Sequence, residues 1–383
     1  MRERAFVAGR WIGAVEPEGA QRIEVRNPSD GAVIGSVPAL GLDAARHAID
    51  AAQDAFPAWS RRLPRQRADI LMAWHELILR HKDALTALMT LEQGKPLADA
   101  ASEIDYAASF VRWFAEEANR TYGETIPSHL PDRKLFVQRE ALGVVALVTP
   151  WNFPSAMLTR KAAAALAAGC ACVAVPSSET PFSALALAAL AEEAGLPAGL
   201  LSVLTGDART LVGALCRDAR VRGLSFTGST EVGRILMAQC APTVKRLSLE
   251  LGGHAPFIVF ADANLSDAIT AAVAAKYQTG GQDCLAANRI FVAREIYEPF
   301  VQAFAEQARA LKMGDGFNPD IDMGPLINEA TVAKSEAHVA DALAKGARLL
   351  CGGKRAAPGS LFYAPTALAD VTPAMRIMQE ETF

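Results

Sequence analysis

Several short stretches of this 383-residue sequence carry side chains that could do carbonyl chemistry. The first is Thr279-Gly-Gly-Gln-Asp-Cys284, in which two glycines allow a tight turn and a lone thiol follows it. A cysteine thiolate is a strong nucleophile, and a thiol just past such a turn can be exposed to a substrate. The alternative is that Cys284 is a small buried hydrophobic residue, the usual state of a free cysteine.

Two polar residues elsewhere could assist such a nucleophile. Asn152 follows a predicted strand and a tryptophan, and its side-chain amide could donate a hydrogen bond to a developing oxyanion. Glu250 precedes Leu-Gly-Gly253, between two predicted α/β series, where a carboxylate could act as a general base. Each has a structural alternative: an Asx-turn for Asn152, and a surface or capping carboxylate for Glu250.

A fourth stretch, Phe226-Thr-Gly-Ser-Thr-Glu-Val-Gly233, lies between a predicted strand and a predicted helix. The N-terminus of that helix would present backbone N–H groups and a positive dipole end to a phosphate. The stretch matches neither G-x-G-x-x-G nor the P-loop pattern. An ordinary turn capped by Ser or Thr therefore remains an alternative.

Composition excludes several classes of function. The net charge is −4 with a pI of about 5.9, so there is no basic footprint for nucleic acid. The six cysteines contain no C-x-x-C pair and the histidines have no metal-type spacing, so we expect no metal site, a reducing compartment and a cytoplasmic location. The longest apolar run, residues 162–175, is too short to span a membrane and predicts a helix followed by a buried strand.

The elements that must position these residues alternate between strand and helix from residue 143 onward. Such alternation predicts an open parallel sheet with helices on both faces, and ligands bind at the carboxyl ends of its strands. A second α/β series follows Gly253. The predicted strands are 144–148, 172–175, 201–204, 223–226, 257–259, 290–292 and 348–351, and helices are expected over 42–56, 65–91 and 100–119 before them, with small strands within 6–37.

The order of the chemical stretches resembles that of the aldehyde dehydrogenase superfamily, and the resemblance extends from about Phe6 to Phe383. The stretches that carry it are Thr149-Pro-Trp-Asn-Phe-Pro154, Phe226–Gly233, Glu250-Leu-Gly-Gly253, Gly281-Gln-x-Cys284 and Glu381-x-Phe383. Three more are similar to the succinate-semialdehyde dehydrogenase branch: Leu91-Glu-Gln-Gly-Lys-Pro-Leu97, Thr159-Arg-Lys161 and Thr180-Pro-Phe-Ser-Ala-Leu-Ala-Leu187.

The resemblance implies an α/β fold with three parts. A Rossmann-like dinucleotide-binding domain is expected over 1–122 and 142–250, an α/β catalytic domain over 251–383, and a small β arm for oligomerisation over 123–141. Family members continue beyond the position of Phe383, so we expect the catalytic domain and the partner sheet of the arm to be incomplete here. The full-length form is expected to be a homodimer or homotetramer without nucleic-acid or membrane partners.

The resemblance also implies NAD(P)-dependent oxidation of an aldehyde, such as succinate semialdehyde, to the carboxylic acid. Cys284 is the expected nucleophile, Asn152 and the Cys284 backbone N–H the oxyanion donors, and Glu250 the base that activates water. Arg160 and Gln278 are expected to bind the substrate carboxylate. The expected cofactor-binding residues are Thr149, Pro150, Trp151, Ser178, Phe226, Gly228, Ser229, Gly233 and Glu381.

Four departures from the family pattern bear on activity. Val175 occupies the position of a family lysine that contacts the adenosine ribose. Ser178 occupies the position of a family glutamate, and this replacement favours NADP over NAD. Gln278 replaces a carboxylate-binding arginine and loses the bidentate charge pairing. Asp283 places a carboxylate beside the thiol, which disfavours the thiolate. Two alternatives therefore stay open: a weakly active or inactive binding or assembly protein, and a dehydrogenase for another aldehyde.

Overall fold

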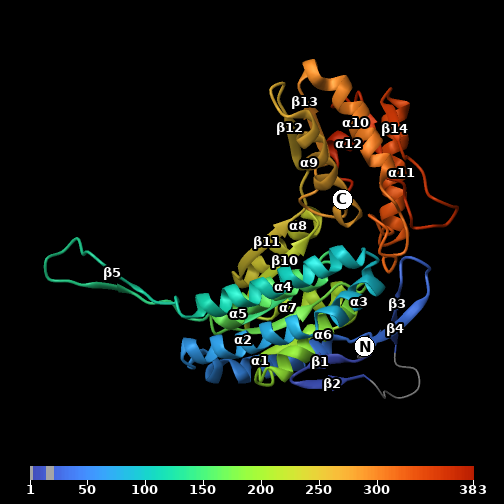
Figure 1. The fold of residues 1–383 in the computed structure, drawn as a ribbon. Coiled ribbons are helices and arrows are strands. Elements are labelled where there is room, and N and C mark those ends of the chain that lie inside the picture. The colour runs from blue at the N-terminus through green and yellow to red at the C-terminus, as the bar shows by residue number, and fades with distance from the viewer. Residues whose placement is uncertain (1–2, 14–20) are drawn as a thin grey trace. The chain divides into compact units, whose positions relative to one another are not determined.

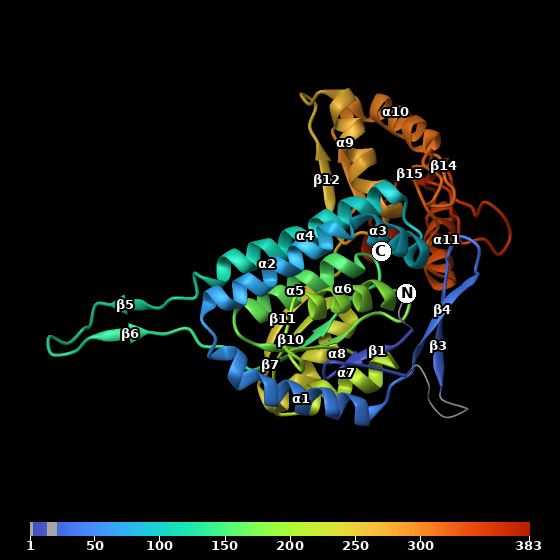
Figure 2. The ribbon, with the colours of Figure 1, turned by 60° about the horizontal axis from the view of Figure 1, so that its bottom comes forward.

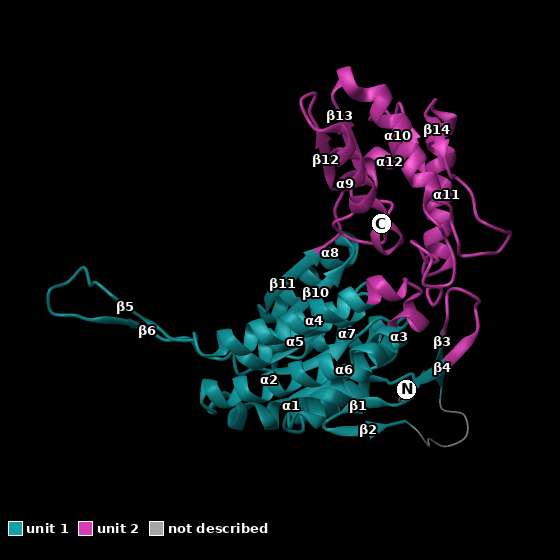
Figure 3. Ribbon diagram, in the orientation of Figure 1, with its two compact units in different colours: residues 1–25, 35–88, 101–250 teal, residues 26–34, 89–100, 251–383 magenta. Residues whose placement is uncertain are grey.

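The computed structural model describes residues 3–13 and 21–383, and the chain divides into two compact units (Figure 3). Unit 1 comprises residues 1–25, 35–88 and 101–250. Unit 2 comprises residues 26–34, 89–100 and 251–383. The sequence pattern did not indicate that the two short segments before residue 101 belong with the C-terminal part of the chain.

Unit 1 is built on a seven-stranded sheet with the order β11-β10-β7-β8-β9-β1-β2 (Figure 1). Its four central strands are parallel, which confirms the predicted parallel sheet: β7 (Val144–Val148), β8 (Ala171–Val175), β9 (Leu201–Val203) and β10 (Val221–Gly228). All of β8 is buried, as expected for a strand covered on both faces. β1 (Ala5–Val7) and β2 (Arg10–Ile12) add antiparallel strands beyond β9, and β11 (Arg246–Leu251) forms the opposite edge.

Helices cover both faces of this sheet (Figure 2). On one face lie α1 (Leu42–Ser60), α7 (Ala208–Arg217) and α8 (Thr230–Cys240), and on the other lie α5 (Pro154–Ala167) and α6 (Pro181–Glu193). α2 (Pro64–Arg80) packs on α5 and α6. Two buried indoles fix these layers, because Trp59 donates to the Leu166 carbonyl and Trp74 to the Leu187 carbonyl, each at 3.0 Å.

The single helix predicted over 65–91 is wrong, since the structure has α2 followed by α3 (Lys82–Gln93). His81 leaves the helical conformation, with φ −99° and ψ 17°. Residues 79–81 are exposed, so no apolar contact on that side holds the two segments in line. The next helix, α4 (Leu97–Ala118), agrees with its prediction within three residues.

A long antiparallel hairpin follows α4. It is formed by β5 (Glu124–Ile126) and β6 (Leu135–Val137), with Glu124 opposite Val137, and it projects from the rest of unit 1 (Figure 2). All six strand residues are exposed. The hairpin lies within the segment 123–141, where a small β arm was expected; its strand β5 was not predicted individually, because its pairing partner lies beyond a loop in the sequence.

Unit 2 contains two small sheets. β12 (Pro256–Val259) and β13 (Arg289–Val292) are parallel and are joined through α9 (Leu265–Tyr277). β14 (Arg348–Cys351) and β15 (Ala367–Ala369) are antiparallel. Its other helices include α10 (Tyr297–Ala310), α11 (Glu329–Ala344) and α12 (Arg376–Gln379), and a further strand pair, β3 (Arg22–Arg26) and β4 (Val33–Pro38), crosses the boundary between the units in sequence.

The core of unit 2 forms where α9 and α10 pack together. Tyr277, Phe300 and Phe304 are its large buried side chains, and the rings of Phe300 and Phe304 stack with centroids 5.9 Å apart. Within residues 3–13 and 21–383, no helix combines the length and apolar character that crossing a membrane requires. The same residues contain no cluster of three acidic, histidine or cysteine side chains suited to a metal ion.

Candidate active site

The residues predicted for the site are divided between the two units. Cys284, Gln278 and Glu381 lie in unit 2. The others lie in unit 1, at the ends of strands β7, β8, β10 and β11 or on the helices that follow them: Thr149, Pro150, Trp151, Asn152, Arg160, Ser178, Phe226, Gly228, Ser229, Gly233 and Glu250.

Asn152 lies in the turn that connects β7 to α5 and is only 6% exposed. The turn begins at buried Thr149, whose N–H donates to the Val175 carbonyl of the neighbouring strand. It ends where α5 starts, and there the carboxylate of Glu103 accepts hydrogen bonds from the backbone N–H groups of Ser155 at 2.9 Å and Ala156 at 3.1 Å. A buried carboxylate at a helix N-terminus satisfies donors that the helix itself cannot.

Glu103 is a residue that the sequence reasoning missed. It lies on α4, far from Asn152 in sequence, and nothing in the local pattern of α4 distinguishes it from other helical glutamates. Its burial, at 2% exposure, is what marks it, because a buried carboxylate is rare without partners.

Two adjacent cationic residues follow on α5. The guanidinium carbon of Arg160 lies 4.8 Å from the centre of the Phe110 ring, a cation–π contact that orients the side chain. Lys161 is 6% exposed, and its ammonium lies 3.1 Å from the hydroxyl oxygen of Ser225 on β10. Burial lowers the pKa of Lys161 to about 8, while the charge of Glu250 opposes this shift. Glu250 itself is exposed, on the edge strand β11.

The predicted phosphate site lies in the turn between β10 and α8. Ser229 is the N-cap of α8, and its hydroxyl accepts from the Val232 N–H at 3.3 Å. This Ser-capped turn was the structural alternative, but the two interpretations are compatible because the cap occupies one of several N–H groups at a helix start. A methyl group at Gly228 would lie 2.5 Å from the buried Phe226 ring, so the ring or the turn would have to shift to admit a larger residue. Gly233 is buried in the first turn of α8.

Two of the four residues that depart from the family pattern lie at the end of β8 and in the turn that follows it. Val175 is the last residue of β8 and is 1% exposed, so its side chain belongs to the core. Ser178 is exposed three residues later. A small hydroxyl at an exposed strand end leaves space for a ligand group beside it.

In unit 2, the Thr279–Cys284 stretch begins with a left-handed turn directly after α9. Thr279, Gly280 and Gly281 have φ values of 53°, 65° and 73°. This conformation is easy for glycine and strained for threonine. Cys284 follows it and is exposed, whereas the other five cysteines are buried. The alternative of a buried, packed Cys284 is therefore wrong.

Hydrogen bonds anchor this turn on both sides. The Thr279 N–H donates to the Asp99 carboxylate at 3.0 Å, and burial raises the pKa of Asp99. The buried Gln282 side chain accepts from the Ile327 N–H at 3.0 Å. The Asp283 carboxylate accepts from the Leu285 N–H at 3.0 Å, which directs it toward the following backbone. Gln278 is exposed at the end of α9.

Glu381 packs against the glycine pair that follows β11. Its carboxylate accepts from the Gly253 N–H at 3.1 Å. A methyl group at Gly252 would lie 2.2 Å from a Glu381 carboxylate oxygen, so a larger residue there would displace the Glu381 side chain. The Glu250-Leu-Gly-Gly253 stretch thus provides a carboxylate near the end of β11 and the backbone that contacts Glu381.

Known proteins resemble this chain throughout its length. The sequence model described as the aldehyde dehydrogenase family matches residues 14–383. Succinate-semialdehyde dehydrogenase [NADP(+)] of Escherichia coli is 52% identical over all of this chain and 79% of its own length, and glutarate-semialdehyde dehydrogenase of Pseudomonas aeruginosa is 50% identical over all of this chain and 78% of its own.

Solved structures agree. The crystal structure of an Escherichia coli NADP-dependent enzyme superposes with a TM-score of 0.97 at 51% identity, covering all of this chain and 79% of that one. A Staphylococcus aureus betaine aldehyde dehydrogenase in complex with NAD+ superposes with a TM-score of 0.95 at 34% identity, covering all of this chain and 77% of that one. The chain therefore belongs to the aldehyde dehydrogenase family.

Proposed function

We propose that this protein oxidises a semialdehyde to the corresponding carboxylic acid with NADP or NAD, by covalent catalysis at Cys284. The observation that carries the proposal is the exposure of Cys284 at the end of a left-handed turn, while the other five cysteines are buried. Relatives at 50–52% identity that are named as succinate- and glutarate-semialdehyde dehydrogenases support the substrate class.

The chemistry assigns one role to each of three residues. The Cys284 thiolate attacks the aldehyde carbon and forms a tetrahedral thiohemiacetal, whose oxyanion accepts hydrogen bonds from the Asn152 amide and the Cys284 N–H. This adduct loses hydride far more readily than a neutral aldehyde and becomes a thioester. Glu250 then removes a proton from water, which attacks the thioester carbon and releases the carboxylic acid and the thiolate.

The residues present fit a dinucleotide cofactor. The N-terminus of α8 at Gly228–Ser229, where glycine leaves the backbone open beside the Phe226 ring, suits a diphosphate. Glu381, whose carboxylate accepts a hydrogen bond from the Gly253 N–H, suits the nicotinamide ribose. Ser178 leaves space for a 2′-phosphate. When bound, the nicotinamide supplies the acceptor for the hydride. The cofactor-binding set is completed by Thr149, Pro150, Trp151 and Gly233.

NADP is the preferred cofactor in this proposal. The small hydroxyl of exposed Ser178 supports it, as does the name of the Escherichia coli relative. The buried Val175 side chain offers no hydrogen bond to either cofactor, so the affinity for both is lower than a lysine there would give.

The substrate carboxylate is bound by Arg160, assisted by a hydrogen bond from exposed Gln278. Since Gln278 carries no charge, a second candidate is a dehydrogenase for an aldehyde without a carboxylate. The Asp283 carboxylate beside the nucleophile favours a third, an aldehyde-dehydrogenase-like protein of low activity.

We assign the dinucleotide-binding role to residues 1–122 and 142–250, the catalytic role to 251–383, and oligomerisation to the hairpin within 123–141. The exposed apolar residues of the hairpin, among them Phe136 at 70% exposure, support a homodimer or homotetramer. The cytoplasmic location stays a prediction, based on the free cysteines.

One assay separates these possibilities. NADPH or NADH formation is followed with succinate semialdehyde and with butanal, for the wild type, Cys284→Ala and the matched control Cys240→Ala, which changes a buried thiol. We expect the semialdehyde with NADP to give the highest kcat/KM, and Cys284→Ala alone to abolish turnover. Residual turnover in Cys284→Ala would overturn the covalent mechanism, and a preference for butanal would favour the second candidate.

A further inference from the structure

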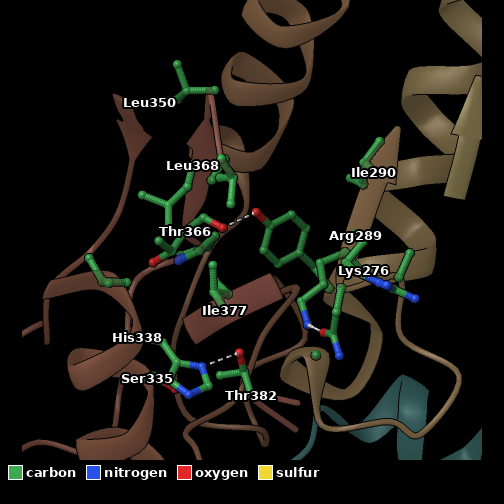
Figure 4. Close-up of a pocket in the computed structure, with 18 of the residues that line it drawn as sticks. Lys276, Arg289, Ile290, Ser335, His338, Leu350, Thr366, Leu368, Ile377 and Thr382 are labelled. Atoms are coloured by element: carbon green, nitrogen blue, oxygen red, sulfur yellow. Dashed lines mark hydrogen bonds between the residues drawn. The ribbon is translucent and has the colours of Figure 1, made fainter. Parts of the chain in front are cut away.

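Lys276 lines a pocket of unit 2 (Figure 4), and Gly280 and Gly281 of the turn that leads to Cys284 line the same pocket. Lys276 is in the last turn of α9, and its Nζ donates to the Asn288 side-chain oxygen at 2.7 Å, just before β13. The Asn288 amide nitrogen donates in turn to the Phe383 carbonyl at 3.2 Å. One lysine therefore links the end of α9, the start of β13 and the C-terminal segment.

The turn itself is packed against this side chain. A methyl group at Gly281 would lie 3.2 Å from Cε and 3.3 Å from Nζ of Lys276, closer than normal van der Waals contact. Gly281 also has φ of 73°, a left-handed conformation in which a residue with a side chain would be strained. The Lys276 side chain therefore packs directly against the residues that lead to Cys284.

Charged groups of both signs surround the ammonium. The carboxylates of Asp283, in the turn, and Glu381, in the C-terminal segment, favour its charged form, whereas burial lowers its pKa to about 8. Two cationic or titratable groups also belong to this neighbourhood: Arg289 at the start of β13, and His254 before β12, whose pKa is lowered by burial and by both Arg289 and Lys276.

We propose that Lys276 is a positioning residue for the nucleophile: its ammonium offsets the negative charge of Asp283 and holds the Gly281–Cys284 turn in place, so that the Cys284 thiolate forms at a lower pH than it would otherwise. The inference rests on the proposed role of Cys284. It accounts for an apparent conflict, because an aspartate directly before a nucleophilic cysteine would by itself disfavour the thiolate.

The mechanism is electrostatic. A carboxylate next to a thiol raises the thiol pKa, and a cation packed against the same turn reduces the effect of that carboxylate on its surroundings. Partial burial of the lysine makes this compensation stronger than between exposed charges, which water and salt screen. The hydrogen bond to Asn288 keeps the ammonium at its position, since a free lysine side chain would move to solvent.

Alkylation of Cys284 by iodoacetamide, measured as a rate against pH, tests this without requiring turnover. The variants are Lys276→Met, Lys276→Arg, Asp283→Asn and Lys276→Met with Asp283→Asn, and Lys334→Met is the control because Lys334 is an exposed lysine of the same unit. Cys284→Ala identifies the alkylated residue. Circular dichroism shows whether each variant is folded, so that a change in alkylation rate caused by unfolding is recognised.

We expect Lys276→Met to raise the midpoint of the alkylation profile by about one pH unit, roughly a tenfold slower reaction at neutral pH. Lys276→Arg should restore most of this, Asp283→Asn should lower the midpoint, and the double variant should return toward the wild type. A folded Lys276→Met protein with the wild-type midpoint would overturn the proposal. If the wild type alkylates as expected but oxidises no aldehyde, the proposed function fails and this inference stands.

A second measurement applies if Lys276→Met does not fold. Cyanate carbamylates only neutral amines, so labelling of Lys276 reports its deprotonated fraction by peptide mass spectrometry. Removal of a neighbouring anion in Asp283→Asn should increase that labelling severalfold at pH 7.5, with labelling of Lys334 unchanged. Equal labelling of Lys276 in both proteins would show that the two charges are not coupled and would overturn the proposal.

Discussion

The carboxylate of Glu103 on α4 accepts a hydrogen bond of 2.9 Å from the backbone N–H of Ser155, in the first turn of α5. Through this bond, a helix that contributes no predicted site residue fixes the start of the helix that follows Asn152. The bond is buried, so its loss leaves unsatisfied N–H groups that water cannot easily reach.

The first prediction concerns this bond. Glu103→Ala should lower the free energy of unfolding by about 2–3 kcal/mol, the range for hydrogen bonds to a charged group. It should also reduce kcat, because the turn that holds Asn152 loses its anchor. Glu103→Gln retains an acceptor oxygen, so its free energy of unfolding and its kcat should decrease less than those of Glu103→Ala. Urea unfolding and steady-state kinetics measure these effects, with exposed Glu116→Gln on the same helix as the control. Equal stability of Glu103→Ala and the control would contradict the assignment.

The second prediction is a pH dependence of stability. The pKa of Lys161 is about 8 in the folded protein, below its ordinary value of 10.5, because the side chain is buried. Between these two pH values the unfolded chain binds a proton that the folded protein has released. The free energy of unfolding should therefore rise from pH 8 to 10.5, by at most about 1.4 kcal/mol per pH unit from this group.

Lys161→Met isolates that contribution. The unfolding free energy of the wild type minus that of Lys161→Met should increase as the pH rises from 8 to 10.5. Below pH 7 this difference should stay constant. Urea titrations at several pH values measure it, with exposed Lys134→Met as the control, which should show no such trend. A constant difference across the whole range would mean that Lys161 titrates normally.

The third prediction concerns the cofactor. Gly228→Ala places a methyl group 2.5 Å from the buried Phe226 ring, so the ring or the turn must move. We expect cofactor binding to weaken about tenfold, since overpacking of this kind costs about 1–3 kcal/mol. Quenching of tryptophan fluorescence by NADPH measures the affinity. Gly41→Ala is the control because no atom lies close to a methyl group added there. Equal affinity of both variants for NADPH would show that the turn at Gly228 does not contribute to cofactor binding.

The fourth prediction concerns substrate selection. Arg160→Met should reduce kcat/KM for succinate semialdehyde on the order of 10²-fold, corresponding to the loss of a charge-assisted hydrogen-bond pair of about 2–3 kcal/mol. The kcat/KM for butanal should change little. Arg160→Lys keeps the positive charge but loses the bidentate guanidinium geometry. Its kcat/KM for succinate semialdehyde should lie between those of the wild type and Arg160→Met. An equal loss for both aldehydes would show that Arg160 supports the fold or the chemistry and does not select the carboxylate.

The fifth prediction concerns assembly. Phe136→Asp places a charge on the exposed apolar face of the β5–β6 hairpin, where Phe136 is 70% exposed. We expect a shift toward the monomer, at least tenfold in the association constant, because a buried unpaired charge opposes an apolar interface. Analytical ultracentrifugation measures the mass. Asp132→Asn, a change in the polar loop of the same hairpin, should leave it unaltered, and an unchanged mass for Phe136→Asp would exclude the hairpin from the interface.

Much of the fold could be predicted because its pattern is local. The strands β7 and β8 agree with prediction within one residue, since an apolar run bounded by turn residues specifies a covered strand. The break at His81 was not predicted, because the helical pattern continues through exposed residues 79–81. Strand β5 was not predicted, because it depends on pairing with β6 beyond a loop.

The sequence by itself determined the family and the α/β alternation, and it predicted the chemical residues, because these depend on residue types and their order. Only the tertiary structure decided that Cys284 is exposed while five other thiols are buried, that the Glu103 carboxylate binds the first N–H groups of α5, and that Lys276 packs against the turn leading to Cys284. Burial and charge compensation arise between side chains brought together by folding, and no spacing in the sequence encodes those distances.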